Sequence, residues 1–100
     1  MKITEKELVR LGFALDQWED SMYGKDNAMD TVFKEYKLTM QEGLSLTITY
    51  VINKASKKLH AMDSSIDIAH DYVEMNITDT AELYTTIEAA KILFKHAKKS

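Results

Sequence analysis

The sequence predicts an α+β domain in which a helix at each end of the chain packs on one face of an antiparallel β-meander. Three observations support this prediction: a helix-start signal at residue 4, apolar residues that alternate with period two over residues 31–53, and an amphipathic helical pattern after residue 79. A chain of 100 residues is long enough for one modest core, so residues 1–100 are expected to form a single domain.

The first helix is expected to begin at the capping box Thr4-Glu-Lys-Glu7. In such a box the Thr4 hydroxyl accepts from the backbone N–H of Glu7, and the Glu7 carboxylate accepts from the N–H of Thr4. Gly12 predicts the end of this helix, because glycine readily adopts the left-handed conformation that follows a helix.

A single longer helix is the alternative, because five apolar residues share heptad spacing: Leu8, Leu11, Leu15, Trp18 and Met22. Gly12 would cost that helix roughly 1 kcal/mol relative to alanine. We favour the stop at Gly12. Residues Ala14–Met22 would then form a second short helix or an irregular crossing, and Tyr23–Asn27 a turn.

The middle of the chain predicts a meander of three to four strands. The expected strands cover about Thr31–Gln41, Leu44–Ile52, Lys58–Met62 and Val73–Ile77. The second of these has the clearest alternation of apolar and hydroxylic residues. We therefore expect Leu46, Ile48 and Tyr50 to be buried, and Thr47 and Thr49 to be more exposed.

The last element is expected to be a long amphipathic helix that packs on one sheet face. Asp79 and Glu82 have capping-box spacing, with Asp in place of Ser or Thr. The apolar stripe that follows consists of Leu83, Ile87, Ala90, Phe94 and Ala97.

Composition argues against several classes of function. The chain has no cysteine, so Cys-ligated zinc and disulfides are impossible. Its net charge of −3 argues against direct nucleic-acid binding, which needs a basic face. The apolar runs are short and no signal peptide is recognisable, so we expect a cytoplasmic protein without membrane contact. The isolated glycines form no phosphate loop and no catalytic motif is present, so we expect neither enzyme activity nor a cofactor.

Acidic residues gather in the second half of the chain. No Lys or Arg occurs between Lys58 and Lys91. Within that interval a local acidic stretch is expected to form an interaction surface for a basic partner, and its residues are Asp63, Asp67, Asp71 and Glu74.

The segment HAMDSSIDIAHD, residues 60–71, raises the possibility of a metal site. His60, Asp63, Asp67 and His70 are spaced by three, four and three residues, and on a helix they would share one face. Turn chemistry at Asp63-Ser64-Ser65, followed by alternating isoleucines, instead favours a turn and a strand, which would separate the four side chains. A ligand pair of His60 and His70 stays open if their strands pair.

Three stretches resemble small uncharacterised proteins of bacteriophages and mobile elements, particularly of Bacteroides-like bacteria. They are ELVRLGF, LSLTITYVINKASKKLH and NITDTAELYTTIEAAKIL. The resemblance concerns layout and implies a compact α+β domain. It implies no activity and assigns no functional residues.

These observations lead us to expect a non-catalytic protein that acts by binding another macromolecule, namely a protein, and a phage-type modulator of a host protein is a natural subclass. The alternative is a metal- or small-molecule-binding protein that uses His60, Asp63, Asp67 and His70. We also expect a homodimer that forms through the helices, because large apolar side chains beyond what a small core can cover favour association. The expected anchors are Trp18, Met22 and Phe94.

Overall fold

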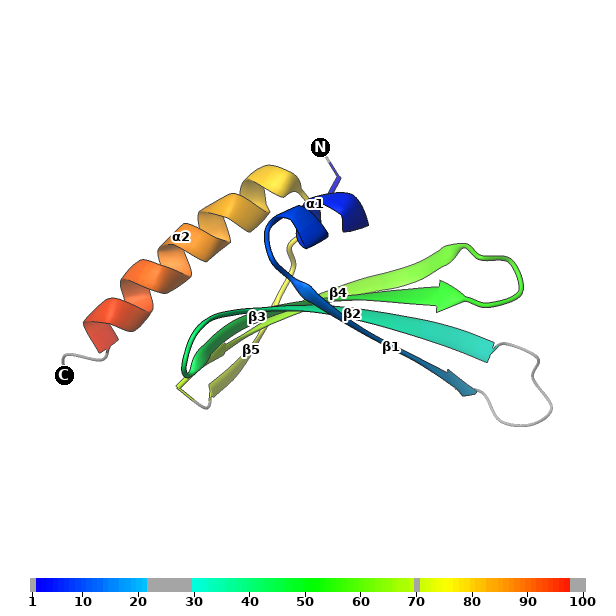
Figure 1. Cartoon of the computed structure of the whole chain (residues 1–100), viewed down its shortest axis with the longest axis horizontal. Helices are drawn as coiled ribbons and strands as arrows, with labels where there is room; N and C mark the ends of the chain where they lie inside the picture. The colour runs from blue at the N-terminus through cyan, green and yellow to red at the C-terminus, as the bar shows by residue number, and fades with distance from the viewer. Residues whose placement is uncertain (1, 22–29, 70, 98–100) are drawn as a thin grey trace.

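The computed structural model describes residues 2–21, 30–69 and 71–97, and it describes residues 20, 21, 30, 94, 96 and 97 by their backbone alone. The chain has an α+β fold with a short N-terminal helix, a five-stranded antiparallel sheet and a C-terminal helix (Figure 1). The elements are α1 (Glu5–Arg10), β1 (Ala14–Ser21), β2 (Asp30–Gln41), β3 (Leu44–Asn53), β4 (Leu59–Ile68), β5 (Asp71–Met75) and α2 (Thr80–Ala97). The strand order in the sheet is the order in the chain, β1-β2-β3-β4-β5.

The sheet has one strand more than the sequence predicts. The expectation of a helix or irregular crossing over Ala14–Met22 is wrong, because Ala14–Ser21 forms the edge strand β1 and pairs with β2. All described side chains of β1 are exposed, so no buried face imposes an alternating pattern on its sequence. The predicted turn Tyr23–Asn27 lies outside the described residues.

The predicted turn at Asp63-Ser64-Ser65 is also wrong, because β4 runs without a break through it. The Ser64 hydroxyl is buried and accepts a hydrogen bond from the backbone N–H of Ile77 at 3.0 Å. Since this contact satisfies the hydroxyl, serine is tolerated inside the strand. The chain turns after Ile68 instead, where Ala69 has a φ of +49°.

Helix α1 starts and ends where the sequence predicts. The Thr4 hydroxyl accepts from the N–H of Glu7 at 3.2 Å. Gly12 has a φ of +98°, and the N–H groups of Gly12 and Phe13 donate to the last carbonyls of the helix at 3.0 Å each. Only half of the expected capping box forms, because the Glu7 carboxylate bonds to Arg10 and Tyr84 rather than to the Thr4 N–H.

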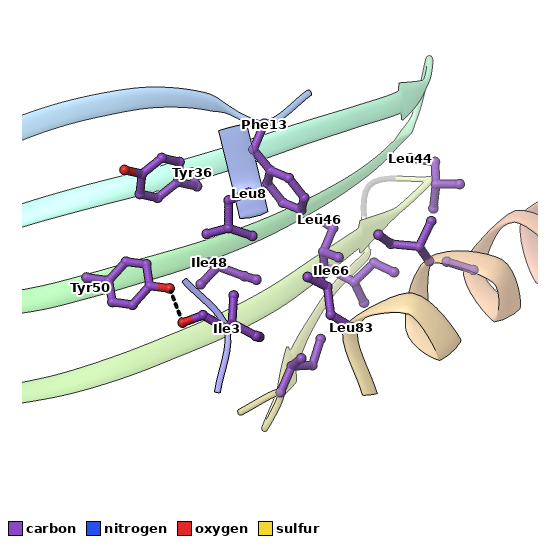
Figure 2. Close-up of a cluster of buried hydrophobic side chains, with 13 residues drawn as sticks. Ile3, Leu8, Phe13, Tyr36, Leu44, Leu46, Ile48, Tyr50, Ile66 and Leu83 are labelled. Atoms are coloured by element: carbon purple, nitrogen blue, oxygen red, sulfur yellow. Dashed lines mark hydrogen bonds between the residues drawn. The ribbon is translucent and has the colours of Figure 1, made fainter. Parts of the chain in front are cut away.

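The hydrophobic core lies between the helices and one face of the sheet (Figure 2). Leu46 and Ile48 of β3 are fully buried and Tyr50 is nearly so, whereas Thr47 and Thr49 on the opposite face are half-buried, as predicted. The other members of the core are Ile3, Leu8, Phe13, Tyr36, Leu44, Ile66, Ile77, Leu83, Ile87 and Ala90. The predicted stripe of α2 therefore faces the sheet through Leu83, Ile87 and Ala90.

Both helices lie on the same side of the sheet, and α2 extends past its end (Figure 1). Glu5 of α1 accepts hydrogen bonds from Lys34 at 3.1 Å and from the Tyr36 hydroxyl. Burial and this hydrogen bond raise the pKa of Tyr36. The Tyr50 hydroxyl donates to the carbonyl of Ile3 at 3.2 Å. These polar contacts fix the N-terminal segment on the sheet.

A polar cluster joins the two helices. The Glu7 carboxylate accepts from Arg10 and from the Tyr84 hydroxyl, and Arg10 also donates to the Tyr84 oxygen at 2.7 Å. The hydrogen bonds from Arg10 and Tyr84 lower the pKa of Glu7 from 4.5 to about 2.

This cluster predicts that the fold loses stability as the solution becomes acidic. A carboxyl whose pKa is lower in the folded than in the unfolded chain stabilises the fold above its unfolded pKa, and the contribution is lost as the pH falls from 4.5 towards about 2. The melting temperature should therefore fall less between pH 5 and pH 2 in Glu7→Gln than in the wild type. Thermal denaturation followed by circular dichroism measures this. Glu88→Gln, an exposed carboxylate of α2, is the control, and the same acid sensitivity in Glu7→Gln and the wild type would contradict the prediction.

Candidate functional site on the open face of the sheet

The face of the sheet turned away from the helices, here called the open face, carries a mixed set of polar and aromatic side chains. Directly paired residues of an antiparallel sheet point to the same face, so the strand register identifies its members. The described side chains on this face that concern us are Asp16, Trp18, Phe33, Glu35, Lys37, Ser45, Thr47, Thr49, Val51, Asp63, Ser65, Asp67, Tyr72 and Glu74.

The open face is hollowed. A hollow of about 430 Å³ extends across it from Trp18 on β1 to Tyr72 on β5, and a second hollow of about 280 Å³ adjoins it and shares Lys37 and Asp67. Val51 is only 7 % exposed although both helices lie on the other face. Val51 pairs with Phe33 and Ala61 in the register, so it lies among the side chains of the open face and not under a helix.

Two serines that are nearly buried as residues line these hollows. Ser65 is 9 % exposed and lines the larger hollow, and Ser45 is 7 % exposed and lines the smaller one. Neither hydroxyl has a hydrogen-bond partner among the described residues. Since no buried side-chain oxygen or nitrogen in the described part of the chain lacks a partner, these two oxygens are accessible from the hollows and can bond to a group that enters from outside.

Aromatic side chains lie at both ends of the larger hollow. Trp18 stacks on Phe33 with ring centroids 5.3 Å apart and an interplanar angle of 10°. Trp18 is 40 % exposed and Tyr72, at the other end, 64 % exposed. Exposed aromatic rings of this kind are enriched at binding surfaces, because they bury much area and lose little conformational freedom.

The charges on the open face are mostly negative and unpaired. Among the described side chains it carries the carboxylates of Asp16, Glu35, Asp63, Asp67 and Glu74 and one ammonium group, that of Lys37. In the described part of the chain none of these six groups forms an ion pair or hydrogen bond. The carboxylates of helix α1 differ in this respect, because Glu5 forms an ion pair with Lys34 and Glu7 forms one with Arg10.

The structure brings together three of the four residues of the predicted acidic surface. Asp63 and Asp67 line the larger hollow, and Glu74 lies on the same face opposite Ser65. Asp71 pairs with Ile68, whose side chain belongs to the helix-covered face, so Asp71 lies apart from the other three.

Of the three predicted interface anchors, the structure describes the side chain of Trp18 alone. Trp18 belongs to strand β1 and points to the open face, away from α2, so its expected place in a helix contact is wrong. Met22 lies outside the described residues. Phe94 belongs to α2, and its side chain is not described.

The predicted metal ligands lie along one strand. His60, Asp63 and Asp67 are all in β4, and His70 falls outside the described residues. Asp63 and Asp67 share a face but are about 13 Å apart along an extended strand, which is too far for both to bind one ion directly. In residues 2–21, 30–69 and 71–97 no group of three or more potential ligands is close enough to hold a metal.

Sequence reasoning missed most of the hollow. Thr47 lies on the face of β3 that the sequence predicts to be the more exposed one, and Phe33 and Glu35 of β2 lie on the same side of the sheet. Period-two alternation does place these residues on one side of each strand. The pairing of neighbouring strands from β2 to β5 is needed to show that they line the same hollow as Asp63 and Tyr72.

Fold and site together describe an α+β meander with a concave acidic face. No protein-family model matches the chain, and no curated protein and no solved structure is similar to it. Neither described helix is long and apolar enough to cross a membrane.

Proposed function

We propose that the chain is a non-catalytic binding protein whose partner is another protein, and that the open face is the surface that binds it. The observation that carries the proposal is the hollow between Trp18 and Tyr72, which the chain's own helices leave uncovered and which is lined by Ser65, whose hydroxyl has no partner among the described residues. Exposed Trp and Tyr side chains beside such a hollow are typical of protein-binding surfaces.

The charge of the open face supports a protein partner over nucleic acid, because five carboxylates against one ammonium group repel phosphates. The proposed setting is the cytoplasm, and the resemblance to phage-type proteins supports a modulator of a host protein. The alternative, metal binding through His60, Asp63, Asp67 and His70, has less support, since the extended strand separates the two aspartates.

Site-specific photo-crosslinking in cells of the source organism tests the proposal. The photoreactive residue p-benzoylphenylalanine replaces Thr47 in the hollow in one variant, and exposed Leu93 of α2 in the other. We expect the Thr47 variant to give one discrete product with a different protein that the Leu93 variant does not give. Identical products from both positions, or none from Thr47, would overturn the proposal.

The same experiment tests the proposed homodimer. A product from the Leu93 position with twice the 11.5 kDa mass of the chain would identify a second copy bound through α2, in agreement with association through the helices. A product of that mass from Thr47 would instead make a second copy the occupant of the open face, which would contradict a different protein as its partner.

A further inference from the structure

We propose that the partner presents an extended, cationic segment, rich in arginine or lysine, that lies in the hollow across the strands. This inference rests on the proposed function and specifies the chemistry of the segment that binds. It has three independent supports in the described residues: unpaired charge, exposed aromatic rings, and serine hydroxyls in the hollows that lack partners.

Charge complementarity is the first support. Glu35, Asp63 and Asp67 line the larger hollow together with one described cation, Lys37, which forms no ion pair with them and leaves an excess of negative charge. Asp16 and Glu74 extend the negative charge to the strands at each edge. Carboxylates spread over one hollowed face make the electrostatic potential there negative, and a guanidinium or ammonium group is attracted to it.

The aromatic rings are the second support. Arginine and lysine bind over the faces of Trp and Tyr through cation–π attraction. The Trp18–Phe33 stack fixes one ring at one end of the hollow, and Tyr72 supplies a second at the other end. A guanidinium group can stack on an aromatic ring and donate hydrogen bonds to a carboxylate at the same time. A hollow lined by both kinds of side chain therefore suits arginine.

The two serines are the third support and the one that favours a peptide over free cations. As residues Ser45 and Ser65 are at least nine-tenths buried, and their hydroxyls face the hollows without a hydrogen-bond partner among the described residues. A peptide backbone supplies donors and acceptors to which such hydroxyls can bond. Four interstrand spacings separate β1 from β5, which is about 19 Å along the sheet, or about six residues of extended chain.

Fluorescence anisotropy with a labelled peptide of alternating glycine and arginine, about six residues long, tests the inference. A peptide of the same length with glutamate in place of arginine is the matched ligand control. We expect saturable binding of the arginine peptide that weakens as salt is raised, and none of the glutamate peptide. The double variant Asp63→Asn/Asp67→Asn should weaken binding roughly tenfold or more, and Trp18→Leu should weaken it as well.

The control variant Glu42→Gln/Glu88→Gln removes the same charge from exposed sites outside the hollow and should leave the affinity unchanged within about twofold. Amide spectra recorded by NMR show that each variant is folded. Equal loss of affinity in both double variants would indicate attraction to net charge alone and would overturn the inference.

Failure of this inference and failure of the proposed function can be told apart. The first case is that the arginine and glutamate peptides bind equally, or that a neutral oligosaccharide binds instead, while the Thr47 variant still crosslinks to one discrete protein. The inference of a cationic segment is then wrong, and the proposed protein binding stands. If Thr47 gives no specific product either, both are wrong.

Discussion

Replacing Ile48 with alanine should lower the free energy of unfolding by about 2–5 kcal/mol. Ile48 is fully buried in the central strand β3, between Tyr36 of β2 and Ser64 of β4 in the register. Truncation removes buried methyl groups and leaves a cavity that the paired strands on both sides prevent from closing. Because a domain of this size has a total stability of about 5–15 kcal/mol, the loss would be a large part of it.

Urea denaturation followed by tryptophan fluorescence measures this change, since the chain has one tryptophan. Ile92→Ala is the matched control, because it removes the same atoms from a side chain of α2 that is 58 % exposed, and it should change stability by less than about 1 kcal/mol. If both variants lost the same stability at an unchanged denaturant slope, the placement of Ile48 in the core would be wrong.

The second large effect is expected for Leu83→Ala, again about 2–5 kcal/mol. Leu83 is fully buried, and it is the first of three buried side chains that attach α2 to the sheet. The other two, Ile87 and Ala90, lie further along the same stripe. Since Leu83 is the largest fully buried side chain among those of α2 that the structure describes, its loss near the start of α2 should weaken the attachment of the whole helix.

Leu93→Ala provides a control with the same residue on the same helix, because Leu93 is 57 % exposed. Its free energy of unfolding should stay within about 1 kcal/mol of the wild type. Hydrogen exchange of the α2 amides adds a local measurement, and we expect faster exchange in Leu83→Ala than in Leu93→Ala. Equal exchange in the two variants would show that the stripe does not hold α2 on the sheet.

The sequence predicted the elements that have one buried face and one exposed face. Strand β3 alternates because one side contacts the core, and α2 has its stripe for the same reason. Strand β1 was missed because both of its faces are exposed, so its residues follow no period, and the spacing of Leu15 and Trp18 instead resembled a helix. Exposed edge strands carry little pattern from which they could be predicted.

Strand β4 shows a second limit of pattern reading. Asp63-Ser64-Ser65 has turn chemistry, but in the sheet Ser64 bonds to the backbone of Ile77 and Ser65 lines the hollow. The tertiary contact outweighs the local preference. The acidic surface was partly predictable, because no Lys or Arg interrupts the carboxylates between Lys58 and Lys91. Its partners Trp18, Phe33 and Thr47 come from strands distant in the chain and could not be predicted in the same way.

The identity of strand order and chain order has a consequence for how the chain folds. Each strand finds its partner across a short connection, so the loop-closure entropy of building the sheet is small and hairpins can form early. The contact of Arg10 with Tyr84, by contrast, joins residues 74 positions apart. We therefore expect the sheet to form first and the two ends of the chain to dock on it last. Substitutions in α1 and α2 should then change mainly the unfolding rate and have little effect on the folding rate.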